Sequence, residues 1–233
     1  MGQLHRVAVA ATVGLALVGG SSTAAFAAPS PGAGIAAQRL EITDRINARL
    51  SELDALSTAL GAAKQLSTAH RSTLTALVTN DKAGLTTLRT TVAGETTTAA
   101  LKADAASMIN DYRIFMLAGP QVRLTISGDL EAAAIVRLTP VVTTLTNDIA
   151  AAKKAGKDTT KAEADLSDLK AKLAAAGSSV AGMADTLLAV RPGPDATAIG
   201  ASVTTARQAV RTSRGDLKAA AADAKDIRAQ LHA

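Results

Sequence analysis

Cysteine and tryptophan are absent from this chain of 233 residues, which also has only one Tyr and two Phe. The lack of cysteine excludes disulfides, thiolate chemistry and lipid attachment at a cysteine. The scarcity of aromatic residues means that a core must be built from Leu, Val, Ile and Ala. Because Ala is small, its presence at helix interfaces predicts helices that pack closely together.

Candidate catalytic groups are equally scarce. Nucleophilic catalysis needs a base beside the nucleophile, but the chain has only three His. His5 lies near the N-terminus, His232 is the penultimate residue, and His70 has polar neighbours and is expected to be solvated. Asp165 and Asp168 have helical spacing, which a solvated helix flank explains without catalysis. Metal-ligand spacing and phosphate-binding glycine loops are also missing, so we expect a protein that is not an enzyme and uses no metal or cofactor.

The first 27 residues follow a different pattern from the rest of the chain. His5 and Arg6 precede the apolar run VAVAATVGLALVGG, and Ala25-Phe26-Ala27 has the small-x-small pattern of a cleavage site. A membrane anchor is the alternative, but glycines interrupt the run, and spanning a bilayer needs about 20 apolar residues. We predict a signal peptide over 1–27, a disordered linker over 28–34, and a secreted protein without stable membrane insertion.

From residue 35 onward, apolar residues recur at spacings of three and four, which is typical of amphipathic helices. A first helix is predicted over 35–63, a second after Ser67, which is suited to cap it, and a third from 96–98. Together they predict an N-terminal helical bundle over 35–118. The apolar positions include Ile42, Ile46, Leu53, Leu56 and Leu60 in the first helix and Leu74, Val78, Leu85 and Val92 in the second.

The most regular spacing lies in the C-terminal half, where three segments alternate spacings of four and three and predict coiled-coil packing. AGKDTT at 155–160 and VRPGPD at 190–195 separate these segments, and short breaks between long helices predict antiparallel neighbours. We therefore predict a three-helix coiled-coil bundle over 119–233. The predicted fold class is all-α, with elongated antiparallel helical coiled-coil bundles. We expect two three-helix bundles that share one kinked helix.

The stretch DYRIFMLAGPQVRLTISGD at 111–129 differs from the Ala- and Thr-rich sequence around it. Its Gly119-Pro120 pair either ends one helix and begins another or lies inside a kinked helix. The apolar spacing stays in register across the proline, which favours one kinked helix over about 96–127. Larger side chains at this point either fill the junction between bundles or form an apolar groove for a partner. They are Tyr112, Phe115 and Met116.

The last predicted helix has its basic residues on one flank. Each follows a core position of the predicted helix by one residue, whereas Asp216, Asp223 and Asp226 each precede one. Flanks of opposite sign suit pairing with neighbouring helices or plain solvation, and the sharper alternative is a basic flank that binds an external polyanion. The candidate residues for a partner are Arg207, Arg211, Arg214 and Lys218, and Lys225 and Arg228 continue the row.

Four segments carry a resemblance to known proteins. AAKQLSTAHRSTLTAL, DYRIFMLAGPQVRL, AGKDTTKAEADLSDLKAKL and ARQAVRTSRGDLKAAAADAKDIRAQL resemble a group of exported, helix-rich bacterial proteins of unknown function, common in actinobacteria. The resemblance implies export and an all-helical fold, and it transfers no catalytic residue. KQLSTAHRSTL is also similar to the LTxxQ segment of the periplasmic Spy-type chaperones, with His70 or Arg71 in place of Gln.

These observations predict an exported, non-enzymatic scaffold or interaction protein of the cell envelope or medium. The alternative is a chaperone-like or polyanion-binding protein that uses the basic flank of the last helix and the segment from Tyr112 to Leu117. The expected partner is a protein or an envelope polymer, and a monomer is favoured. A net charge of only +5, spread along the chain, and the lack of stacking aromatics argue against nucleic acid.

Overall fold

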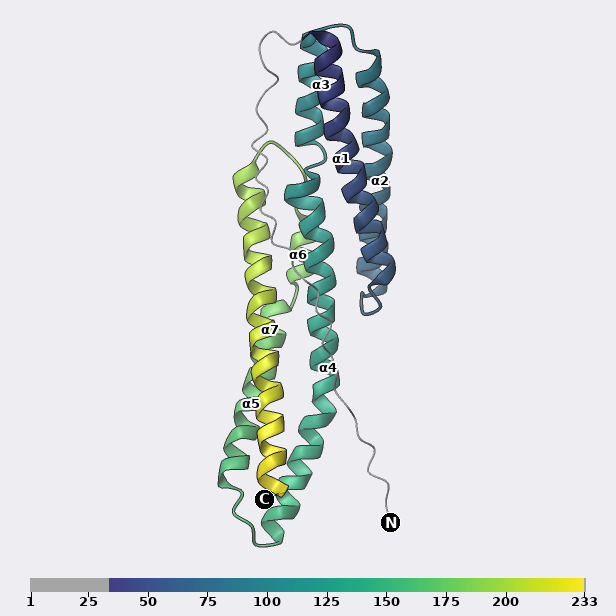
Figure 1. Cartoon of the computed structure of the whole chain (residues 1–233). Coiled ribbons are helices and arrows are strands. Elements are labelled where there is room, and N and C mark those ends of the chain that lie inside the picture. The colour runs from purple at the N-terminus through teal and green to yellow at the C-terminus, as the bar shows by residue number, and fades with distance from the viewer. Residues whose placement is uncertain (1–33, 233) are drawn as a thin grey trace. The chain divides into compact units, whose positions relative to one another are not determined.

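The computed structural model describes residues 34–232. The predicted signal peptide over 1–27 and almost all of the predicted linker over 28–34 therefore lie outside the described residues. Within 34–232 every regular element is a helix and no strand forms (Figure 1). The fold class is all-α, as the sequence predicts. None of the described helices is long and apolar enough to cross a membrane.

The helices begin and end largely where the turn and cap residues predict. Ser67 accepts a hydrogen bond from the backbone N–H of His70 at 3.1 Å, and Thr97 accepts one from Ala100 at 3.2 Å, so both are N-caps. In chain order the elements are α1 (Ile35–Ala62), α2 (Thr68–Gly94), α3 (Thr98–Asn110), the π-helix η1 (Ile114–Ala118), α4 (Gly119–Lys154), α5 (Thr160–Val180), α6 (Met183–Ala189) and α7 (Ala196–His232).

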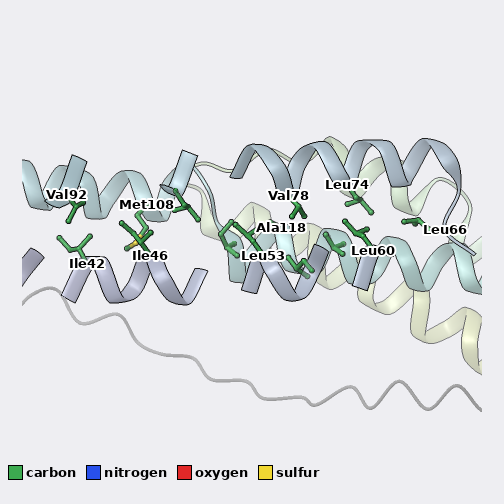
Figure 2. Close-up of a cluster of buried hydrophobic side chains, with 14 of the residues drawn as sticks. Ile42, Ile46, Leu53, Leu60, Leu66, Leu74, Val78, Val92, Met108 and Ala118 are labelled. Atoms are coloured by element: carbon green, nitrogen blue, oxygen red, sulfur yellow. The ribbon is translucent and has the colours of Figure 1, made fainter. Parts of the chain in front are cut away.

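One cluster of buried side chains joins α1, α2, α3, η1 and the start of α4. Figure 2 shows Ile42 and Ile46 of α1 facing Val92 of α2 and Met108 of α3. These are positions at spacings of three and four along each helix, so the amphipathic pattern of the sequence is the pattern of burial. Its fully buried residues include Ile46, Leu53, Leu74, Leu85, Val92, Met108 and Val122.

Two further clusters lie along α4, α5, α6 and α7. One cluster contains residues of α5, of the end of α4 and of the C-terminal half of α7. The other contains residues of α6 and of the first half of α7, together with Leu117 of η1. The contact between α5 and α7 is the most extensive among the helices of residues 34–232, and its buried positions include several alanines that let the two helices approach closely. They are Ala162, Ala176, Ala220 and Ala224.

The predicted helix over 96–127 is wrong in one respect. Helical backbone does continue through Gly119-Pro120, because η1 runs directly into α4 and Gly119 has φ −58° and ψ −53°. The interruption falls earlier, at 111–113, where Arg113 adopts a left-handed conformation with φ 47°. Neither Gly nor Pro occurs at 111–113, so the sequence lacks the usual marks of a break, and tertiary contacts of Arg113 hold it.

A second difference concerns the segment 161–190, for which the spacing predicts one uninterrupted helix. The structure divides it into α5 and α6 at Ala181 and Gly182. Gly182 has φ 66°, a left-handed conformation that glycine adopts without steric cost. Met183 and Leu187 are still buried beyond the break, in the cluster with the first half of α7, so the apolar spacing continues across it and periodicity alone does not reveal it.

Candidate functional site

The break at 111–113 is fixed by the side chain of Arg113. Its Nε donates a hydrogen bond to the carbonyl of Gly193 at 2.8 Å, and its Nη2 donates to the carbonyl of Pro194 at 3.0 Å and to Asn110 Oδ1 at 3.1 Å. A left-handed non-glycine residue costs roughly 1 kcal/mol or more, and these three bonds offset that cost. The break and the loop between α6 and α7 are therefore one connected unit.

The same loop is held from α4 by Gln121, a buried side chain. Its Nε2 donates to the carbonyl of Leu187, in the last turn of α6, at 2.9 Å and to the carbonyl of Val190, the C-cap of α6, at 3.0 Å. The Leu187 carbonyl also accepts a hydrogen bond from the backbone N–H of Val190 at 3.2 Å, so Gln121 is a second donor to it at the C-terminal end of α6. Gln121 and Arg113 together place the segment 190–194 beside α2.

A groove of about 330 Å³ lies between α2, the break and the end of α6. It is within the range of small-molecule sites, although at the lower end. Most of its lining is apolar, with a few polar groups that converge on it. Its lining includes Leu77, Asp81, Tyr112, Leu117, Leu188 and Arg191.

Tyr112 reaches the groove because Gly84 leaves room for its ring. A Cβ atom at Gly84 would lie 2.7 Å from Tyr112 Cε1 and 2.9 Å from Tyr112 Cζ, which is too close for any side chain. The glycine in α2 therefore serves a close approach. Burial raises the pKa of Tyr112, with further contributions from the charges of Asp111 and Asp81, so its hydroxyl is neutral at physiological pH.

Asp81 is the acidic group of the groove. Burial raises the pKa of this carboxyl group from 3.8 to about 6. Among residues 34–232 it forms neither an ion pair nor a hydrogen bond, since each ion pair there involves other residues. An ionised, partly buried and unpaired carboxylate is energetically unfavourable.

The predicted cluster of Tyr112, Phe115 and Met116 is divided by the structure. Tyr112 lines the groove, whereas Phe115 and Met116 do not, and these two side chains are 49% and 38% exposed. The guanidinium carbon of Arg49 lies 5.4 Å from the centre of the Phe115 ring, a cation–π distance. Burial, and then the charge of Arg45, lower the pKa of Arg49 to about 10.

The predicted basic flank lies on the exposed surface of α7. Arg207, Arg211, Arg214 and Lys218 are all exposed. Arg214 Nε is 3.0 Å from Oε1 of Glu131, a buried carboxylate of α4, so this flank faces α4. Asp223, on the opposite flank, pairs with Lys172 of α5 at 2.7 Å. Within 34–232 no ion pair involves Arg207, Arg211 or Lys218.

His70 is not the solvated residue that the sequence predicts. Its side chain is only 18% exposed, its Nδ1 lies 2.9 Å from Asp129 Oδ1, and its Nε2 lies 3.2 Å from Asp185 Oδ1. Asp129 also accepts a hydrogen bond from the backbone N–H of Ser67 at 2.7 Å. Burial lowers the pKa of His70, but the hydrogen bonds to Asp129 and Asp185 outweigh it, and the net direction is upward.

This cluster joins three helices, and sequence reasoning missed it because its members lie far apart in the chain. Asp129 is 59 positions and Asp185 is 115 positions from His70. Both ring nitrogens face carboxylates, so both are used in contacts that hold the helices together. Over 34–232 there is no group of three His, Asp or Glu side chains that could hold a metal ion.

Comparisons with protein-family models, curated proteins and solved structures found no match to this chain. The helices of residues 34–232 place the protein in the all-α class. Its two distinctive surfaces are the groove beside the helix break and the basic face of α7. The resemblance to the actinobacterial group of exported proteins stays a prediction.

Proposed function

We propose that this chain is an exported binding protein rather than an enzyme, and that α7 binds an extended anionic polymer of the cell envelope. The observation that carries the proposal is the row of exposed cations on one face of α7. At about 100° per residue, all six fall within an arc of about 100° on the helix surface, and the acidic residues of α7 lie outside it. The six are Arg207, Arg211, Arg214, Lys218, Lys225 and Arg228.

The length of the row favours a polymer over a small anion. Arg207 and Arg228 are 21 positions apart in α7, which corresponds to about 32 Å at 1.5 Å per residue. The Debye length at physiological ionic strength is about 8 Å. The electrostatic potentials of neighbouring cations in the row therefore overlap. A single small anion contacts only one or two of these cations, whereas an extended polyanion contacts all of them.

Linear polyphosphate is a suitable probe, with binding measured by titration from low to physiological salt. If about five phosphates are neutralised, the plot of log affinity against log salt should have a slope of roughly −3 to −4, at about −0.7 per contact. The test variant is Arg207→Glu, Arg211→Glu and Lys218→Glu together. Arg214 is left in place because it pairs with the buried Glu131.

The matched control is Lys64→Glu, Lys102→Glu and Lys170→Glu, three exposed lysines on other elements. It changes the net charge by the same amount. We expect the α7 variant to lose polyphosphate binding and the control to retain most of it. Equal losses in both variants, or no binding at low salt, would overturn the proposal, and binding only to anionic vesicles would replace the polymer by a membrane surface.

A second candidate function, a chaperone-like role, is favoured by Phe115 and Met116, which are adjacent, apolar and exposed. Exposed Met and aromatic side chains are typical of adaptable binding surfaces. In an assay that follows aggregation of an unfolded client, Phe115→Ser should reduce suppression while far-UV circular dichroism and Tm stay unchanged. Suppression that is identical in this variant would remove the candidate.

A further inference from the structure

The groove beside α2 combines an apolar floor with one unpaired negative charge. Leu77, Leu117 and Leu188 come from α2, η1 and α6 and supply most of the apolar lining together with neighbouring alanines and Pro192. The polar lining residues of α2 are Thr73, Asn80 and Asp81, of which only Asp81 is charged, and Tyr112 joins them from the break. An aliphatic chain fits the apolar part, because its burial is favourable at roughly 0.8 kcal/mol per CH₂ group.

Asp81 specifies the charge of the ligand. Among the described residues it has no cationic partner, although it is partly buried in a groove of low polarity. A carboxylate in such surroundings is stabilised by a cation that brings its own hydrogen-bond donors, and a primary ammonium group has three. Tyr112 also lines the groove, and its neutral hydroxyl is able to accept one of them.

Arg191 specifies the other end of the ligand. It lies on the lining of the same groove, is exposed, and forms no ion pair or hydrogen bond within 34–232. A second positive charge on the ligand would meet this guanidinium unfavourably, whereas a carboxylate would pair with it, bidentately in the best case. The groove therefore distinguishes a zwitterion from a diamine.

We propose that this groove binds a small aliphatic molecule with a primary ammonium group at one end and a carboxylate at the other, an ω-amino carboxylate. The ammonium group contacts Asp81 and Tyr112, the alkyl chain lies on the leucines, and the carboxylate contacts Arg191. The occupant is a small molecule because the groove, at about 330 Å³, has the size of one short chain. This inference is independent of the polymer binding assigned to α7.

The test is isothermal titration of the purified protein with four probes of equal chain length. We expect 6-aminohexanoate to bind best, hexylamine to bind less well, 1,6-diaminohexane to bind more weakly than hexylamine, and hexanoate to show no binding. Hexanoate binding as tightly as 6-aminohexanoate would overturn the proposal, because Asp81 would then have no role. A lysine-containing peptide that binds while 6-aminohexanoate does not would also overturn it.

Variants identify the two ends of the ligand separately. Asp81→Asn should lower the affinity for 6-aminohexanoate by about tenfold or more, which is the effect of losing one charged hydrogen-bonded contact. Arg191→Gln should lower the affinity for 6-aminohexanoate but raise the affinity for 1,6-diaminohexane. General damage to the fold cannot produce these opposite changes. Asp44→Asn, an exposed aspartate of α1, is the matched control and should change nothing.

A final arm separates this inference from the proposed function. The α7 variant with three glutamates should bind 6-aminohexanoate like the wild type, and polyphosphate should not compete with it. If Asp81→Asn leaves 6-aminohexanoate binding unchanged in a protein with an unaltered circular dichroism spectrum, the groove assignment is wrong even if α7 binds polyphosphate.

Discussion

Nδ1 of His70 lies 2.9 Å from both carboxylate oxygens of Asp129, so α2 and α4 are joined by a charged hydrogen bond. The ring's other nitrogen faces Asp185 of α6 at 3.2 Å. Both ring nitrogens act as donors only when the imidazole is protonated. The contact therefore links the packing of three helices to the protonation of a single side chain.

Because the pKa of His70 is raised in the folded protein, its stabilising contribution is complete below the unfolded pKa of about 6.5. It is lost as pH rises through the higher folded pKa. We expect His70→Gln to lower stability by about 1 kcal/mol at pH 5.5, a figure reduced for solvent screening, and by much less at pH 8.5. Urea unfolding at both pH values measures this, with His232→Gln as the control. Equal losses at the two pH values would contradict the prediction.

Asp81 should show the opposite sign. Its pKa of about 6 in the folded protein means that its unfavourable contribution is fully present above pH 6 and disappears as pH falls toward 3.8. Asp81→Asn should therefore raise the free energy of unfolding at pH 7.5, by about 1 kcal/mol after allowance for solvent screening. At pH 4 it should have little effect. Thermal unfolding of this variant and of Asp44→Asn tests the prediction, and a lower Tm at pH 7.5 would refute it.

Gly84→Ala should destabilise the protein by about 1 kcal/mol, because the new Cβ atom overlaps the Tyr112 ring. In a Tyr112→Ala background the same change should stabilise by roughly 0.5–1 kcal/mol, since alanine is favoured over glycine inside a helix. The double-mutant cycle gives the coupling energy between the two residues. If the sign does not reverse, the ring does not depend on the space at Gly84.

Arg113 permits a test of the break itself. Both Arg113→Ala and Arg113→Gly remove the hydrogen bonds to Gly193 and Pro194, but only glycine relieves the left-handed strain. We expect the alanine variant to be less stable than the glycine variant by about 1 kcal/mol in urea unfolding. An ordinary helical position gives the reverse order, so a more stable alanine variant would count against the left-handed conformation.

The elements that local chemistry specifies were predictable. Ser67 and the Pro/Gly segment at 191–194 mark boundaries through capping and turn geometry, and the spacing of three and four identified the buried faces of α1, α2 and α7. The two missed breaks differ in kind. Gly182 was visible in the sequence but was hidden by an unbroken apolar rhythm, whereas the break before η1 has no local mark.

The candidate sites were less predictable because they depend on pairs that are distant in sequence. Glu131 and Arg214 of the α4 and α7 contact are 83 positions apart, and the two partners of His70 are 59 and 115 positions from it. Tyr112 was singled out for its rarity, and the structure places it in the groove. Asp81 was missed because an aspartate in a polar helix has no sequence feature that indicates burial.

The close approach of Tyr112 to Gly84 has a spectroscopic consequence. The chain contains no Trp and a single Tyr, so tyrosine emission comes from Tyr112 alone and reports on the groove and on the break beside it. A ligand at Asp81, or any movement of Tyr112 away from α2, changes the surroundings of that one fluorophore. The protein therefore contains its own label at the place where binding is proposed, and no engineered probe is needed to follow it.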